Sequence, residues 1–367
     1  MSKKSRKKRA QRSQSRKKAS AKAQPKQASA AKWLWIVMGA LLLLAMVGGL
    51  WWMTNQQSEQ TPASTATPAQ DLTPEPTPEP TLPPNIGPVS GCIHRPAFVS
   101  QLGMGDQIYI GTNLKGYKGL TLSARQPDGK TLVYQHPTWD DAGNLAAYIL
   151  DGDGNIYVAP APFVSLDENP PEEQNNIYKV DTNTGEMALF LTLPWARPPD
   201  TANPYGVMGL TYDCDTRSLY ASSVAGSTYD DEVGRIFQID LASAQIVSQL
   251  EGVDAFGLGV YRGVNGKRLY FGSARNSGIR SVALDESGAL DAEQRLEFYL
   301  LAAPGGQDER AKRIQFPEKD EMLIKGIEFN YTLRAASDFV EHDYTYRYDP
   351  ASDVWNFEHV RLREGVE

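Results

Sequence analysis

A short strand motif that recurs through residues 89–367 constrains the fold of this chain more than any other feature. Its core is an apolar residue followed by tyrosine or a close variant, at 107–111, 155–158, 218–221, 268–272 and, less faithfully, 321–325. Successive copies are 48, 63, 50 and 53 residues apart, measured at Tyr109, Tyr157, Tyr220, Tyr270 and Leu323. Periods of this length are typical of proteins built from one repeated supersecondary unit.

Three further alternating segments accompany each copy of the motif. One precedes it, at 97–99, 146–150, 208–212, 256–261 and 312–316. A second segment follows the motif, at 120–124, 177–181, 235–240, 279–285 and 344–349. A third segment comes after the turn that closes the second, at 131–134, 187–191, 245–250, 295–300 and 355–360. Period-two alternation closed by Asn, Asp, Gly or Pro predicts hairpins. We therefore expect an all-β protein, a β-propeller of five four-stranded blades.

Burial gives the physical reason for this prediction. A single four-stranded sheet cannot shield both of its faces, whereas sheets stacked radially bury each face against a neighbour. Small residues suit the crowded strands nearest the axis, as at Gly206, Gly209, Gly257 and Gly259. Two alternatives stay open: a sixth blade, because residues 194–204 are unassigned, and a β-sandwich.

Two segments resemble known propeller blades. Residues 151–159, Asp-Gly-Asp-Gly-Asn-Ile-Tyr-Val-Ala, resemble the blade signature of NHL-type and gluconolactonase-like propellers, and residues 176–185 are similar to strand-turn segments of many propeller families. The gluconolactonase-like resemblance implies a metal-dependent lactonase with a cation held on the axis by Glu, Asn and Asp side chains. The Glu-Gly-Pro motif of that class near its first blade is missing, so no catalytic residue is carried over.

The chain before the repeats has the charge pattern of a membrane anchor. Residues 1–32 carry 13 Lys and Arg and no acid, and residues 33–53 are 21 uncharged, mostly apolar residues with Trp at both ends. Such a segment is long enough to cross a bilayer as one helix, and the positive charges keep the N-terminus in the cytoplasm. A cleaved signal peptide is the alternative, disfavoured because the apolar core is long.

The two flanking segments are expected to lack stable structure. The basic tail, residues 1–32, is predicted to be disordered and to contact anionic lipid; nucleic acid is a less favoured partner because no aromatic side chain accompanies the charges. Residues 54–88 form a Pro/Thr-rich extended linker, with nine Pro and six Thr between positions 61 and 88. The prediction is a stalk that holds the domain 89–367 away from the membrane on its extracytoplasmic side.

Two long loops that follow the tyrosine strands of the second and third repeats are acidic. Equivalent loops of a propeller emerge on one face, so their carboxylates are expected to gather there and to bind a cation or a basic partner. The alternative is that these are ordinary solvated loops. The candidate binding residues are Asp167, Glu168, Glu172, Glu173, Tyr229, Asp230, Asp231 and Glu232.

The residue patterns do not indicate a catalytic site. Asp151, Asp153 and Asn155 match the first three ligand positions of a calcium loop, but Ile156 and Pro162 stand where Gly and a closing Glu are needed, which favours a hairpin turn. The sequence contains no Gly-x-Ser-x-Gly elbow and no His-Glu-x-x-His pair. No cofactor is predicted, although a divalent cation on the axis or the acidic face remains an alternative.

Cys92 and Cys214 are the two cysteines of the chain. Both are predicted to lie outside the cytoplasm, where disulfides persist, so they are a candidate disulfide. Val89 to Cys92 also matches a lipoprotein cleavage pattern, but it lies 35 residues beyond the apolar segment.

Together these features predict a single-pass protein of the cell membrane whose extracytoplasmic propeller acts as a recognition or scaffold module. Its partners would be the bilayer, anionic lipid, and an extracytoplasmic protein or glycan. The competing interpretation is a metal-dependent, lactonase-like propeller hydrolase, which would place several carboxylate and amide side chains around the channel.

Overall fold

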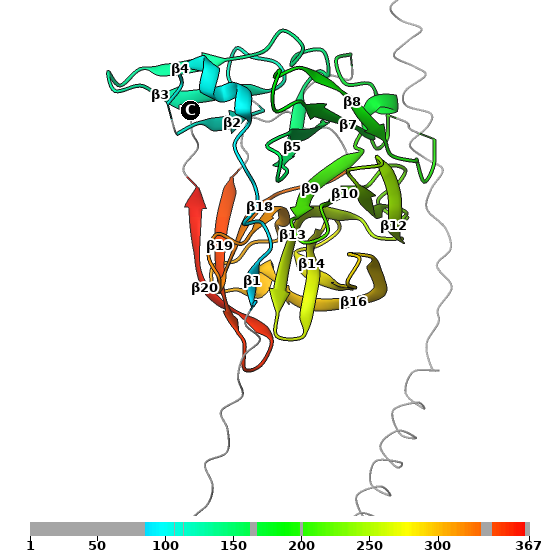
Figure 1. Ribbon diagram of the computed structural model, residues 1–367. Helices are drawn as coiled ribbons and strands as arrows, with labels where there is room; N and C mark the ends of the chain where they lie inside the picture. The colour runs from blue at the N-terminus through cyan, green and yellow to red at the C-terminus, as the bar shows by residue number, and fades with distance from the viewer. Residues whose placement is uncertain are drawn as a thin grey trace, which may run out of the picture. The chain divides into compact units, whose positions relative to one another are not determined.

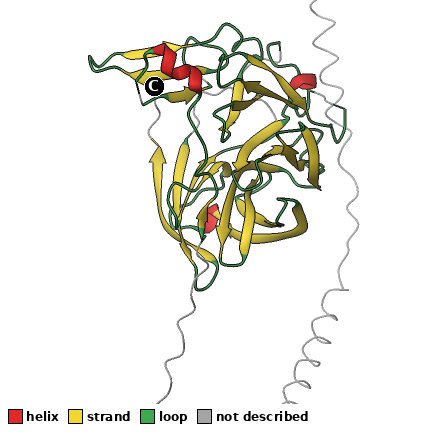
Figure 2. Cartoon of the chain, viewed as in Figure 1, coloured by secondary structure: helices red, strands yellow, loops and turns green. Residues whose placement is uncertain are grey.

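The computed structural model describes residues 85–363 except 106, 113, 162–166, 199–200 and 332–339. The predicted tail, transmembrane helix and most of the linker, residues 1–84, lie outside the described residues. Within the described part, no helix is long and apolar enough to span a bilayer. Strands dominate this part, and its helices are three short 3-10 segments, η1 (Ala97–Leu102), η2 (Pro171–Glu173) and η3 (Leu300–Ala302) (Figure 2).

The strands form five antiparallel sheets, one for each sequence repeat, which confirms the five-bladed propeller and overturns the sandwich alternative (Figure 1). We number these sheets blades 1 to 5 in chain order. Blade 1 has β2 (Tyr109–Gly111), β3 (Thr121–Arg125) and β4 (Thr131–Tyr134); blade 2 has β5 (Leu145–Leu150), β6 (Ile156–Pro160), β7 (Asn176–Val180) and β8 (Met187–Thr192). Blade 3 has β9 (Val207–Asp213), β10 (Ser218–Ser223), β11 (Arg235–Asp240) and β12 (Gln245–Glu251). Blade 4 has β13 (Ala255–Gly263), β14 (Gly266–Ser273), β15 (Gly278–Leu284) and β16 (Leu290–Tyr299), and blade 5 has β17 (Arg310–Gln315), β18 (Glu321–Ile327), β19 (Glu341–Asp349) and β20 (Val354–Arg363).

Blades 2 to 5 each have the four predicted strands, whereas blade 1 has three in the described residues. Residues 97–99, expected as its first strand, lie in η1 instead. The physical reason is that Phe98 and Val99 are both buried in the same core. Adjacent side chains of a strand point to opposite faces, so a helical turn is needed to bury both. The unassigned residues 194–204 connect β8 to β9 and contain no strand in their described part, so no sixth blade is seen there.

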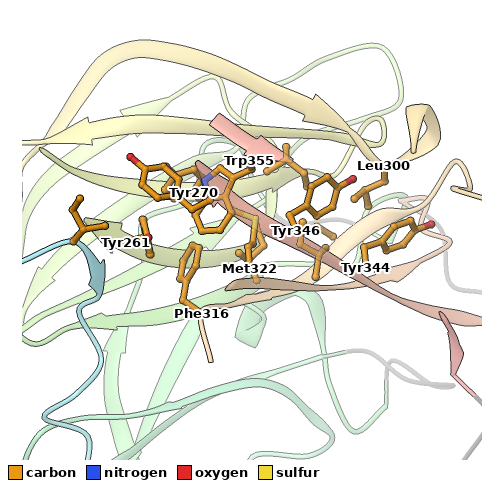
Figure 3. Packing of buried hydrophobic residues seen from close by; sticks show 14 residues of the cluster. Tyr261, Tyr270, Leu300, Phe316, Met322, Tyr344, Tyr346 and Trp355 are labelled. Atoms are coloured by element: carbon orange, nitrogen blue, oxygen red, sulfur yellow. The ribbon is translucent and has the colours of Figure 1, made fainter. Parts of the chain in front are cut away.

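Four apolar cores hold the blades together, one between each consecutive pair from blade 1 to blade 5. The core between blades 4 and 5 is rich in aromatic rings, among them Tyr261, Tyr270, Tyr344 and Trp355 (Figure 3). No fifth core joins blade 5 back to blade 1 in the part of the chain that the structure describes. We call this junction the seam.

Small residues allow the innermost strands to approach one another closely. A Cβ on Gly209 of β9 would lie 2.1 Å from the carbonyl oxygen of Phe256, and one on Gly257 of β13 would lie 2.6 Å from that of Ala311. Both positions therefore exclude any larger residue, which confirms the prediction of small residues on the innermost strands.

The N-terminal residues 85–103, which we call the strap, cross one end of the blades. β1 (Gly87–Pro88) pairs with the end of β13 in blade 4 (Figure 1). Cys92 forms a disulfide with Cys214, in the β9–β10 turn of blade 3. The backbone N–H of His94 donates to the carbonyl of Asp151, and that of Phe98 donates to the carbonyl of Thr182, both in turns of blade 2. The strap thus links blades 4, 3 and 2 to blade 1.

Candidate functional site

A pocket of about 490 Å³ lies between the innermost strands of the propeller, and residues of all five blades line it. Its walls include Ile110 of blade 1, Tyr148 of β5, Gly209 of β9 and Gly257 of β13. Loop residues such as Ala161, Tyr205 and Phe329 also line it, which places the pocket toward the end of the blades opposite the strap.

Blade 5 supplies most of the charged groups of this pocket, namely Lys312, Arg313, Lys325, Glu341 and Arg363. The Lys312 Nζ lies 2.9 Å from a Glu341 carboxylate oxygen, and the Arg363 Nη1 lies 3.3 Å from the other oxygen. The Arg313 guanidinium lies over the ring of Tyr148, 4.6 Å from its centroid, and so connects blade 5 with blade 2. The two glutamates of the lining, Glu328 and Glu341, are thus accompanied by four cationic side chains.

Burial lowers the pKa of Lys325 from its ordinary value, and the positive charges of Arg363 and Arg313 lower it further. Neighbouring Asp343 and Glu341 act in the opposite direction without reversing the shift. Burial is thus the first cause of the shift, and the two arginines add a repulsion that the neighbouring carboxylates only partly offset.

An aromatic cluster forms the loop side of the same pocket. Tyr205 and Phe329 pack edge to face with ring centroids 5.2 Å apart, and Phe256 lies 5.0 Å from Phe329. Tyr331 continues the cluster and donates a hydrogen bond to Asp254. Its pKa is raised, first by burial and then by the Asp254 carboxylate. The pocket therefore has a cationic wall and an aromatic wall.

The acidic loop of blade 3 is anchored rather than free. Arg275 donates hydrogen bonds to the carbonyls of Thr228 and Tyr229 and to the Asp254 carboxylate. Asp231 lies 2.9 Å from the Arg197 guanidinium, and a Glu232 carboxylate oxygen accepts a hydrogen bond from the backbone N–H of Asp254. Asp230 is exposed, and the Tyr229 side chain is 86% exposed.

The acidic loop of blade 2 contacts its own surroundings. Glu168 accepts a hydrogen bond from the Asn144 side chain and lies 3.8 Å from the Lys118 amine. Glu172 and Glu173 are exposed in η2, and Asp167 is exposed beside the undescribed residues 162–166. Both loops emerge at the pocket end, as expected for equivalent loops. The carboxylates of the two loops are engaged by different partners, and binding of a protein partner or cation by these eight residues stays a prediction.

The calcium-like segment at Asp151 is a hairpin turn between β5 and β6. The Asp151 carboxylate accepts hydrogen bonds from the backbone N–H groups of Asp153 and Asn155 and from the Asn155 side chain. Both oxygens of this carboxylate therefore already accept hydrogen bonds from residues of the same turn. Asp153 points outward, 2.6 Å from the Arg217 guanidinium, with both side chains more than half exposed.

Replacing Asp151 by alanine should lower the free energy of unfolding by about 2 kcal/mol, because a buried carboxylate that satisfies three donors is lost. Asp153→Ala is the matched control and should change it by less than about 1 kcal/mol, since exposed ion pairs contribute little. Urea unfolding with and without calcium measures both. Equal losses in the two variants, or stabilisation of the wild type by calcium, would contradict the assignment as a turn.

A lactonase-like propeller would hold a cation on its axis with Glu, Asn and Asp side chains, and the pocket lining offers Glu328, Asn330 and Glu341 beside four cationic side chains. Glu341 is already paired with Lys312 and Arg363, whose positive charges disfavour a further cation beside it. In the described ranges, no group of three or more His, Cys, Asp and Glu side chains is placed to hold a metal ion.

Sequence reasoning missed the cationic wall. The signal was present: the innermost strand of the fifth repeat carries Lys312 and Arg313 where those of the third and fourth carry Gly and Leu. Sequence patterns alone did not show that Lys325 and Arg363, which lie on two other strands of the same blade, join them.

Comparison with known proteins finds only distant structural similarities. No family model and no curated protein matches its sequence. A hypothetical selenium-binding protein from Sulfolobus tokodaii is 12% identical with a TM-score of 0.37, over 66% of each chain. An exo-β-1,3-galactanase from Phanerochaete chrysosporium is 10% identical with a TM-score of 0.43, over 70% of this chain and 61% of that one. The PQQ-bound aldose sugar dehydrogenase from Streptomyces coelicolor is 13% identical with a TM-score of 0.37, over 65% and 75%.

The chain therefore spans less than two thirds of the first two of these structures. At such identities and TM-scores the similarities define neither a family nor an activity.

Proposed function

We propose that this chain is a membrane-anchored binding module whose propeller recognises a ligand outside the cytoplasm. The observation that carries the proposal is the pocket of about 490 Å³ that all five blades line. Its size and its combination of apolar walls with a few convergent polar groups are typical of small-molecule sites. The propeller acts as a rigid frame, and the pocket and its loops act as the recognition surface.

The location follows from the segments before the propeller. In this proposal residues 33–53 cross the bilayer once, residues 1–32 stay in the cytoplasm against anionic lipid, and residues 54–84 separate the propeller from the membrane. The Cys92–Cys214 disulfide supports an extracytoplasmic position, because such bonds persist in oxidising compartments and are rare in the cytosol. In this proposal an extracytoplasmic protein or glycan contacts the exposed acidic loops at the same end.

Protease treatment of intact cells that express the full chain tests the location. We expect the propeller epitope to disappear while an N-terminal epitope is protected, and alkylation of thiols without reduction to leave Cys92 and Cys214 unmodified. Protection of the propeller until the cells are opened, or two free thiols, would refute the extracytoplasmic assignment.

Metal analysis of the purified full-length chain tests the binding role against a metal-dependent hydrolase. We expect no stoichiometric divalent metal and no change in Tm after EDTA treatment. A tightly bound metal, a fall in Tm on chelation and hydrolysis of a lactone would together replace the binding module by the enzyme.

A further inference from the structure

The face of blade 5 that borders the seam is charged along its whole width. Arg313, Lys325, Asp343 and Arg361 are direct cross-strand partners on β17, β18, β19 and β20. Direct partners project from the same face of a sheet, so these four side chains form one transverse row. The alternate residues, among them Ile324 and Tyr344, face the other way into the core with blade 4. This arrangement explains why no apolar core closes the seam.

The charges of this face do not neutralise one another. Glu341 is shared by Lys312 and Arg363, and Asp343 lies within ion-pair distance of no cation in the described residues. Arg313 and Lys325 likewise have no carboxylate within 4 Å there. The pocket and this face together hold three carboxylates, Glu328, Glu341 and Asp343, and five cations, in a domain whose sequence from residue 89 carries 40 acids and 24 bases. The cations are Lys312, Arg313, Lys325, Arg361 and Arg363. This local excess of positive charge favours an anion over a cation in the pocket.

The cationic side chains are also positioned in ways that leave hydrogen-bond donors available. The Arg313 guanidinium lies over the Tyr148 ring, a contact to the ring face that uses none of its N–H groups as donors to an oxygen. Lys325 is half-buried beside it, and its side-chain amine has no hydrogen-bond acceptor among the described residues. Desolvated, preoriented donors of this kind bind carboxylate or phosphate oxygens more strongly than exposed ones.

We propose that the pocket binds a small organic anion, whose carboxylate or phosphate group is received by Arg313 and Lys325 and whose ring or apolar body lies against Tyr205 and Phe329. The inference deepens the proposed binding function and depends on it. The volume of about 490 Å³ admits a molecule of drug or metabolite size. Arg363, exposed at the sheet edge, attracts the anion toward the seam.

The probe for this inference is 2-naphthoate, with 2-naphthamide as its uncharged analogue of the same shape, titrated into the full-length chain by calorimetry. We expect the carboxylate to bind at least tenfold more tightly than the amide, and its affinity to fall between 50 and 500 mM NaCl because the attraction is electrostatic. Lys325→Gln and Arg313→Gln should each abolish most of the preference. Lys130→Gln, which removes an exposed lysine of the β3–β4 turn, is the charge-matched control and should leave it unchanged.

The outcomes separate the two proposals. Equal binding of both probes overturns the anion inference and leaves the pocket as a binding site. No binding of either probe, or a preference that survives in both blade 5 variants, also overturns it. The proposed membrane-anchored function fails on other readouts, the protease protection and the metal analysis described above. Circular dichroism and Tm of each variant establish that lost binding is not lost folding.

Discussion

Replacing Cys92 and Cys214 together by serine is expected to lower the free energy of unfolding by about 5 kcal/mol, the chain-entropy value for a cross-link that closes a loop of this length. The two cysteines are 122 residues apart in sequence, so the reduced unfolded chain gains much freedom. Urea unfolding of the full-length chain, oxidised and in dithiothreitol, measures the difference.

The loss should be concentrated in blade 1 and the strap. Blade 1 shares a buried core with blade 2 alone, since the seam toward blade 5 is polar in the described residues. The strap supplies its second attachment, and the disulfide fixes that strap to blade 3. Amide exchange in β2, β3 and β4 should therefore accelerate more than exchange in β13 and β14. Uniform acceleration in all blades, or a change in stability below about 1 kcal/mol, would contradict the role given to the strap.

The repeat pattern predicted the blades because the residues that determine each strand and its turn lie within the strand and turn themselves. In Ser218–Ser223 and Arg235–Asp240 the alternation and the closing turn residues are local, and the register follows from them. The same reasoning failed for residues 97–99, because three residues of alternation fit a strand and a helical turn equally well. What decided between them was a core in which Phe98 meets Trp139, and that contact is not local in sequence.

The candidate site was less predictable for the same physical reason. Tyr148 and Arg313 are 165 residues apart, and only closure of the propeller brings the guanidinium onto the ring. The two β1 residues are another case, since Gly87 and Pro88 read as linker by composition yet pair with β13. The acidic loops were found from sequence because their charges are contiguous, but their anchoring by Arg275 was not.

Arg275, which anchors the acidic loop of blade 3, is itself bound to Asp254, and the second large loss of stability is expected when Asp254 is replaced. Its carboxylate is fully buried and accepts hydrogen bonds from the N–H of Gly234, the Ser227 hydroxyl, Arg275 and the Tyr331 hydroxyl. It therefore joins the loop of blade 3, the β14–β15 loop of blade 4 and the aromatic wall of the pocket. Asp254→Ala should lower the free energy of unfolding by about 3–5 kcal/mol, because the Arg275 charge and several donors lose their partner.

Asp230→Ala removes an exposed carboxylate from the same loop and is the matched control, expected to change stability by less than about 0.5 kcal/mol. Asp254→Asn should fall between the two, because the amide keeps one acceptor oxygen but places a donor toward Arg275. Denaturant unfolding of the three variants orders them. If Asp254→Ala unfolds within about 1 kcal/mol of the wild type, the carboxylate does not organise this end of the propeller, and the acidic loop would have to be held by Glu232 and Asp231 instead.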